Sequence, residues 1–281
     1  MPYTTIISTA DLAAHVDNPN WAVIDCRFSL QDTELGRRAY RESHIVGAIY
    51  AHLDEDLSGP IVAGKTSRHP LPTMEKFTQT LSNWGIGDET QVVVYDDWGG
   101  AIAARLWWML RWLGHEAAAV LDGGWPAWTG EDRPVRGGAE HRAPTQFTAR
   151  PRPELLADAE EVAGSIESGT LLLVDARSND RYHGMNETND PVAGHIPSAV
   201  NHFYGNNLHE GRFLPPEDLK RIYGPIIGAR PAQQVVLYCG SGVTATHNAL
   251  AMLYAGIGEA RVYPGSWSEW ITDSSRPVAT E

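Results

Sequence analysis

An internal repeat constrains the fold of this 281-residue chain more than any other feature. Four short segments of the first half recur in the same order in the second half, at offsets of 150, 151, 143 and 142 positions. The pairs are Val23–Arg27 with Leu173–Arg177, His44–Ala48 with His195–Ala199, Gln91–Tyr95 with Gln234–Tyr238, and Gly123–Trp128 with Gly265–Trp270. Matches in one order with slowly changing offsets indicate a tandem duplication. We therefore predict two domains of one fold, at residues 1–135 and 153–281.

The segment between the two copies is predicted to be a linker. Residues 131–153 are rich in glycine, proline, arginine and alanine without apolar periodicity, so we assign 136–152 to the linker. The length agrees, because a chain of this size corresponds to about two domains of roughly 150 residues. Hydrophobic residues make up 42% of the chain, enough to give each domain a core.

Both copies alternate short β-branched runs with helical patterns, which is typical of βαβ units around a parallel sheet. In the second copy we expect strands near 171–174 and 235–238, then a helix that ends at Gly256 or Gly258. The first copy repeats this helix and ends it at Gly114. The predicted fold class is α/β, with two tandem domains that each have a central parallel sheet flanked by helices.

Charge and cysteine content exclude several classes of protein. The net charge of −13 argues against binding to nucleic acid or to an anionic membrane, and neither a secretion signal nor a membrane-spanning run is apparent. Cys26 and Cys239 lie 213 positions apart and provide no disulfide framework, CxxC pair or cysteine zinc site. His44 and His195 occupy equivalent repeat positions, so we assign them to the fold and expect no metal or other cofactor. We expect a cytoplasmic protein.

Cys239 lies where the predicted strand 235–238 meets the following helix, at the ligand-binding end of a parallel sheet. The residues that follow it are small: Gly240, Ser241, Gly242, Val243 and Thr244. The glycines permit backbone conformations that turn N–H groups inward, and the helix adds the positive end of its dipole. We expect the N–H groups of Gly240, Gly242, Val243 and Thr244 to hold an anion. Cys239 is predicted to be a thiolate nucleophile rather than an inert buried cysteine.

These segments together resemble the motifs of tandem-domain rhodanese-type sulfurtransferases over essentially the whole chain. The resemblance rests on the Cys-Gly-Ser-Gly-Val-Thr-Ala loop at 239–245, on 194–197, on the Asp-x-Arg strand ends and on the closing Gly-Ser-Trp-Ser-Glu-Trp. It implies that Cys239 takes a sulfane sulfur from a small anionic donor and becomes a persulfide. The sulfur then passes to cyanide, a thiol or a thioredoxin-like acceptor.

The first copy has Asp96 at the position of Cys239, and a carboxylate cannot form a persulfide. The first domain is therefore predicted to be catalytically silent. Cys26 is no substitute, because it lies inside the Asp-x-Arg strand end, and we predict a structural role for it.

Between His44 and the end of the strand at Tyr95, the first copy has eight more residues than the second has between the matching His195 and Tyr238. The extra region contains His69. In the mercaptopyruvate branch of the family, a histidine of this region, backed by an aspartate, is proposed to work with the serine two positions after the cysteine. The resemblance thus implies that His69 relays a proton through Ser241. Asp54 or Asp56 would orient the imidazole. The alternative is that His69 only anchors a proline-bounded loop.

An anionic donor needs a cation, and Arg177 and Arg181 are the candidates. Arg177 belongs to an Asp-x-Arg pair that the silent copy also has, so we assign it to the fold, whereas Arg181 matches the donor-binding arginine of the family. The mercaptopyruvate branch usually has a second arginine further on, but 185–193 has none. Thiosulfate-preferring relatives have basic residues in the cysteine loop, and this loop has none either. We favour 3-mercaptopyruvate as the donor, with thiosulfate:cyanide transfer as the alternative.

Two other classes of protein are alternatives to a sulfurtransferase. A related class of phosphatases also uses a strand, a cysteine loop and a helix, but it needs an arginine six positions after the cysteine. Position 245 is alanine, and the next arginine is Arg261. A non-enzymatic sulfur-binding or regulatory module usually lacks the cysteine, which is present here.

Overall fold

The computed structural model describes residues 1–281 and divides into two compact units. The first unit comprises Met1–Gly59, Pro72–Arg152 and Glu210–Phe213, and the second comprises Pro60–Leu71, Pro153–His209 and Leu214–Glu281. The segment Pro60–Leu71 lies in the first copy of the sequence repeat but packs with the second unit. It carries Arg68 and His69.

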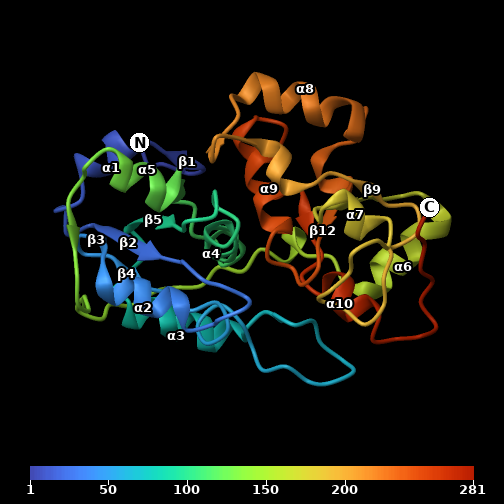
Figure 1. The fold of residues 1–281 in the computed structure, drawn as a ribbon, viewed down its shortest axis with the longest axis horizontal. Helices are drawn as coiled ribbons and strands as arrows, with labels where there is room; N and C mark the ends of the chain where they lie inside the picture. The colour runs from blue at the N-terminus through green and yellow to red at the C-terminus, as the bar shows by residue number, and fades with distance from the viewer. The chain divides into compact units, whose positions relative to one another are not determined.

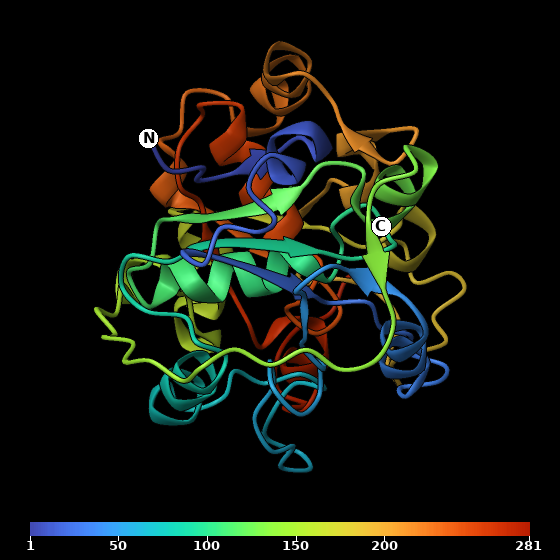
Figure 2. The same cartoon turned by 90° about the vertical axis from the view of Figure 1, so that its left-hand side faces the viewer.

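The first unit contains a five-stranded parallel sheet in the order β1–β6–β5–β2–β4. Its strands are β1 (Ile6–Ile7), β2 (Trp21–Asp25), β4 (Ile49–Tyr50), β5 (Gln91–Tyr95) and β6 (Ala118–Leu121). Its helices are α1 (Thr9–Ala13), α2 (Leu35–Glu42), α3 (Met74–Asn83), α4 (Ala103–Trp112) and α5 (Gly124–Gly130). A short antiparallel pair joins β3 (His44–Ile45) to β7 (Val135–Arg136). Figure 2 shows β6, β5 and β2 side by side and pointing the same way.

The second unit has a four-stranded parallel sheet in the order β13–β12–β8–β9. Its strands are β8 (Leu172–Asp175), β9 (Val200–Asn201), β12 (Val235–Tyr238) and β13 (Arg261–Val262). Its helices are α6 (Ala159–Ser168), α7 (Asn179–Tyr182), α8 (Pro216–Ile227), α9 (Ala245–Tyr254) and α10 (Ser266–Trp270). The short elements are η1 (Pro153–Leu155), η2 (Tyr204–Asn207), η3 (Ala232–Gln234), β10 (Leu208–His209) and, in the first unit, β11 (Arg212–Phe213).

The predicted α/β class, with parallel sheets flanked by helices, is confirmed in both units (Figure 1). β8 and β12 match the expected strands to within one residue. The helix α9 ends two residues before Gly256, and α4 ends two residues before Gly114. Both glycines have a left-handed φ, of 72° and 81°, so each stops its helix as expected. None of the helices combines the length and the apolar character that a membrane span requires.

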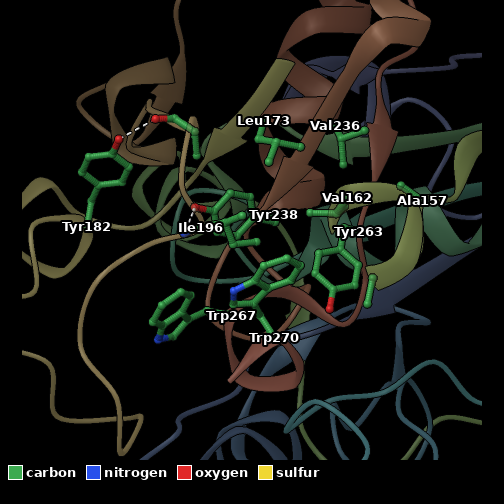
Figure 3. Close-up of a cluster of buried hydrophobic side chains, with 12 residues drawn as sticks. Ala157, Val162, Leu173, Tyr182, Ile196, Val236, Tyr238, Tyr263, Trp267 and Trp270 are labelled. Atoms are coloured by element: carbon green, nitrogen blue, oxygen red, sulfur yellow. Dashed lines mark hydrogen bonds between the residues drawn. The ribbon is translucent and has the colours of Figure 1, made fainter. Parts of the chain in front are cut away.

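Aromatic side chains in the core of the second unit fix the end of β12. Trp267 and Trp270 are fully buried and lie beside Tyr238 and Tyr263 (Figure 3). The Tyr238 hydroxyl accepts the N–H of Ile196 at 3.2 Å. Because Tyr238 is the last residue of β12 and Cys239 follows it directly, packing of this core also fixes the position of the Cys239 backbone.

A buried ion pair lies at the end of β2 in the first unit and at the end of β8 in the second. Arg27 Nη2 lies 2.7 Å from Asp25 Oδ2, and Arg177 Nη2 lies 2.6 Å from Asp175 Oδ2. All four side chains are nearly inaccessible to solvent, and both pairs have the same geometry. The pair occurs in the copy without an active-site cysteine too, which supports the structural assignment of Arg177.

Candidate active site

Cys239 begins the Cys239 loop, residues 239–245, which joins β12 to the first residue of α9. Its backbone N–H donates to Ser266 Oγ at 3.1 Å, and its carbonyl accepts the N–H of Trp267 at 3.0 Å. Gly242 has a φ of 80°, and a Cβ atom there would lie 2.2 Å from the carbonyl oxygen of Pro264. Only glycine fits this position, and the role of Gly242 in holding an anion stays a prediction.

Gly240 is small for a different reason. It does not have a left-handed φ, so a special backbone conformation is not what favours glycine at this position. A Cβ atom at Gly240 would instead lie 2.9 Å from the Arg68 guanidinium. The glycine therefore makes room for a cation beside the loop. Further along the loop, the carbonyl of Val243 accepts the Thr246 hydroxyl at 2.7 Å.

The Cys239 thiol is surrounded by hydrogen-bond donors. Its Sγ accepts the N–H of Gly242 at 3.2 Å. Complete burial raises the pKa of Cys239, but hydrogen bonds from the Thr244 side chain and from the N–H groups of Ser241, Ala245 and Gly242 outweigh it. The pKa is thus lowered overall, which increases the thiolate fraction at neutral pH.

The second cysteine has the opposite environment. Cys26 is fully buried, and its burial raises the thiol pKa well above the ordinary value. The charges of Asp25, Asp96 and Asp56 raise it further. Cys26 is therefore held as a neutral thiol, which fits the structural role predicted for it.

His69 and Ser241 are brought together within the second unit. His69 Nδ1 lies 2.8 Å from Ser241 Oγ, and both residues are buried. This distance allows a proton to pass between hydroxyl and imidazole. Asp54 belongs to the first unit, where its N–H donates to the ring of His52, and Asp56 Oδ2 accepts the N–H of His52. The orienting role of Asp54 or Asp56 stays a prediction.

Arg181, on α7, lies beside the Cys239 loop together with Arg68. A Cβ atom at Gly240 would be 3.5 Å from Arg181 Nη2. Arg181 Nε and Nη2 each donate to Glu187 at 3.0 Å, and Nη2 lies 3.4 Å from Asp190. Arg68 Nη1 pairs with Asp190 as well. Burial lowers the pKa of Arg68, against the charge of the Cys239 thiolate, which raises it.

Ser266 is a site residue that the sequence reasoning missed. It has a φ of 53°, a left-handed conformation in which a serine is strained, and its Oγ accepts the N–H of Cys239. The equivalent residue of the first copy is Gly124, with a φ of 54°. The exchange of glycine for serine in the copy that has the cysteine was visible in the repeat and was a usable signal.

Together these groups can stabilise a sulfur anion, accept or deliver a proton next to it, and hold a second anion on guanidinium groups.

A sequence profile of the rhodanese-like domain matches residues 8–131 and 158–273, and the two α/β units match that class of fold. The chain belongs to the rhodanese family, with two rhodanese-like domains in tandem.

Relatives place the chain more narrowly within that family. It is 45% identical to the "Probable 3-mercaptopyruvate sulfurtransferase" of Pseudomonas aeruginosa, over 100% of this chain and 99% of that protein. It is 35% identical to the thiosulfate sulfurtransferase of Rattus norvegicus, over 95% of this chain and 92% of that protein. The solved structure of the 3-mercaptopyruvate sulfurtransferase from Leishmania major superimposes with a TM-score of 0.84 and 30% identity, covering 95% of this chain and 74% of that chain. The chain is therefore an enzyme, a sulfurtransferase.

Proposed function

We propose that Cys239 is the sulfur-carrying nucleophile of this sulfurtransferase and that 3-mercaptopyruvate is its donor. The observation that carries the proposal is the set of hydrogen-bond donors around Cys239, which lowers the thiol pKa at a completely buried position. A buried cysteine without such donors is held as the neutral thiol, as Cys26 is. The same donors would hold the negative charge of a persulfide.

The transfer from 3-mercaptopyruvate balances without any other reactant. The Cys239 thiolate attacks the donor sulfur, an S–S bond forms, and the C–S bond of the donor breaks. The electron pair of that bond moves to the carbon, which takes up the proton of the donor thiol, so that pyruvate leaves and a persulfide anion remains. Cyanide or an acceptor thiolate then attacks the outer sulfur, and the Cys239 thiolate returns.

The pair formed by His69 and Ser241 supports 3-mercaptopyruvate over thiosulfate. The carbon that leaves from 3-mercaptopyruvate must be protonated, whereas sulfite leaves thiosulfate without needing a proton on carbon. His69 Nδ1 and Ser241 Oγ, 2.8 Å apart beside the loop, form a path for that proton. The Pseudomonas aeruginosa relative, which carries the 3-mercaptopyruvate name, supports the same donor. Thiosulfate:cyanide transfer is the second candidate.

The proposal includes a division of labour between the domains. Residues 153–281 form the catalytic domain, 136–152 the linker and 1–135 a domain that is silent because Asp96 replaces the cysteine. The segment 60–71 of that first copy packs with the second unit and brings Arg68 and His69 to it. The physiological acceptor is a thiol or a thioredoxin-like protein, and cyanide can substitute for it. We place the enzyme in the cytoplasm, because its two cysteines, 213 positions apart, provide no disulfide framework of the kind typical of secreted proteins.

Intact mass after incubation with each donor tests the assignment of the nucleophile. The wild-type chain and Cys26→Ala should each gain one sulfur atom, and Cys239→Ala should gain none. Uptake of sulfur by Cys239→Ala would refute the role of Cys239. The ratio of kcat/KM for 3-mercaptopyruvate and thiosulfate then decides the donor, and a higher value for thiosulfate would favour the second candidate.

A further inference from the structure

Two guanidinium groups meet beside the Cys239 loop although they come from distant parts of the chain. A Cβ atom at Gly240 would lie 2.9 Å from Arg68 Nη2 and 3.5 Å from Arg181 Nη2, so both cations flank the peptide that follows Cys239. The Arg68 backbone is fixed there, because its N–H donates to Ser268 Oγ at 3.1 Å. The N–H of Ser268 in turn donates to the carbonyl of Gly240 at 2.9 Å.

A single carboxylate, that of Asp190, bridges the two cations. Its Oδ1 pairs with Arg68 Nη1, and its Oδ2 lies 3.4 Å from Arg181 Nη2. The Asp190 side chain is only 2% exposed, whereas those of Arg68 and Arg181 are 31% and 19% exposed. Paired guanidiniums are suited to binding carboxylates and oxyanions. Asp190 thus takes up hydrogen-bond donors of both guanidinium groups.

Glu187 also pairs with Arg181 but has a different role. It accepts two parallel hydrogen bonds from Arg181, at 3.0 Å each, and lies 3.4 Å from Arg177 Nη1. This bidentate contact orients the Arg181 guanidinium and balances its charge. Asp190 makes one contact to each cation, which leaves it as the ligand that an incoming anion can replace.

We propose that Arg68 and Arg181 form the donor-anion site and that Asp190 is an internal competitor which the donor displaces. The inference rests on the proposed function of Cys239. Arg68 supplies the second arginine that the segment 185–193 lacks. Because Asp190 brings one negative charge, it opposes a doubly charged donor such as thiosulfate more than the single carboxylate of 3-mercaptopyruvate. Asp190 is therefore a residue that sets donor specificity.

Anion binding without chemistry tests the site. In a Cys239→Ser background, calorimetry measures the affinity for sulfate, an unreactive dianion, and for pyruvate, a monoanion. Asp190→Asn and Asp190→Ala should both bind sulfate about 10-fold more tightly, with a gain of about 3-fold for pyruvate. Adding Arg68→Gln to Asp190→Asn should remove the gain. Asp273→Asn, which neutralises an exposed carboxylate of the same unit, is the control and should change affinity by less than about 2-fold.

The outcomes separate this inference from the proposed function. Unchanged sulfate affinity in a folded Asp190→Ala variant would overturn the competitor role, and a gain that survives Arg68→Gln would overturn the site. Neither result depends on sulfur transfer, since the background lacks the thiol. In the enzyme with Cys239 intact, Asp190→Asn should raise kcat/KM for thiosulfate relative to 3-mercaptopyruvate by about 3-fold or more. No change in that ratio would refute the specificity role.

Discussion

The two copies of the strand, loop and helix hold different anions in the same kind of loop. In the first unit, Asp96 Oδ1 accepts the N–H groups of Trp98 and Gly100, and Oδ2 accepts those of Ile102 and Ala103, all at 2.8 Å. In the second unit, the donors of the Cys239 loop surround a single sulfur atom. The anion-binding loop is thus a property of the repeated fold, and we propose that the residue at its first position decides whether the loop is catalytic.

The carboxylate of Asp96 also indicates the size of the anionic group that such a loop can surround. Each Asp96 oxygen lies two bonds beyond Cβ, as the outer sulfur of a persulfide would at Cys239. The first copy therefore shows four N–H donors around a group whose outer atoms are as many bonds from Cβ as the outer sulfur of a persulfide, although the longer bonds to sulfur place that atom further out. The comparison predicts opposite phenotypes for the two positions: loss of chemistry at Cys239 and loss of stability at Asp96.

The largest effect is expected for Cys239→Ala. Removal of the nucleophile should lower kcat/KM for either donor by about 10⁴-fold or more, because no other group can carry the sulfur. The free energy of unfolding, measured with urea, should change by no more than about 1 kcal/mol, since a small thiol becomes a methyl group. Activity that persists in this variant would contradict the division of labour between the copies.

Asp96→Ala should show the reverse. It leaves four buried N–H groups without their acceptor, so we expect a loss of about 3 kcal/mol or more in the free energy of unfolding. The kcat of the folded fraction should stay within about 2-fold of wild type, because Asp96 lies outside the unit that carries Cys239. The adjacent exposed residue provides the control, and Asp97→Ala should cost less than about 1 kcal/mol. Equal losses in both variants would mean that the Asp96 loop needs no anion.

Much of this comparison is available from the sequence. The repeat predicts the two sheets, and the equivalence of Asp96 and Cys239 follows from the matched strands that precede them. Hydrophobic periodicity and glycine stops predict α4 and α9, because these features are local to each helix. The glycine-containing loop also predicts a special backbone conformation after Cys239, and Gly242 has the left-handed φ that this requires.

Other parts of the candidate site could not be predicted in this way. The segment that carries Arg68 has no counterpart in the second copy, so the repeat gives no partner for it. The bridge that Asp190 makes between two arginines depends on packing between residues that are 122 positions apart. Spacing along the chain carries no information about such contacts. The segment 185–193 contains no arginine or lysine, and in our proposal Arg68, elsewhere in the second unit, supplies that charge.

His69→Ala sharpens the comparison of donors. Loss of the imidazole should slow the reaction of 3-mercaptopyruvate by about 100-fold, because the leaving carbon loses its proton relay. Thiosulfate turnover should fall by less than about 5-fold, since sulfite leaves without a proton on carbon. Steady-state kinetics with both donors measure this, with the exposed His209→Ala as the control. Equal slowing of both donors would assign His69 a structural role.

The smallest effect is expected in the titration of the two thiols. Thiolate absorbance at 240 nm, recorded against a variant without cysteines, isolates Cys239 in Cys26→Ala and Cys26 in Cys239→Ala. The Cys239 midpoint should fall below the ordinary cysteine pKa of about 8.5, because its hydrogen-bond donors outweigh burial. Cys26 should remain un-ionised well above that pH, since burial and three carboxylates raise its pKa.

A pKa that is lower in the folded state adds stability above the unfolded pKa, and this contribution is lost as the pH falls through the folded value. Wild type should therefore lose stability relative to Cys239→Ala as the pH falls through the Cys239 midpoint, and coincident midpoints for the two thiols would contradict the proposed nucleophile.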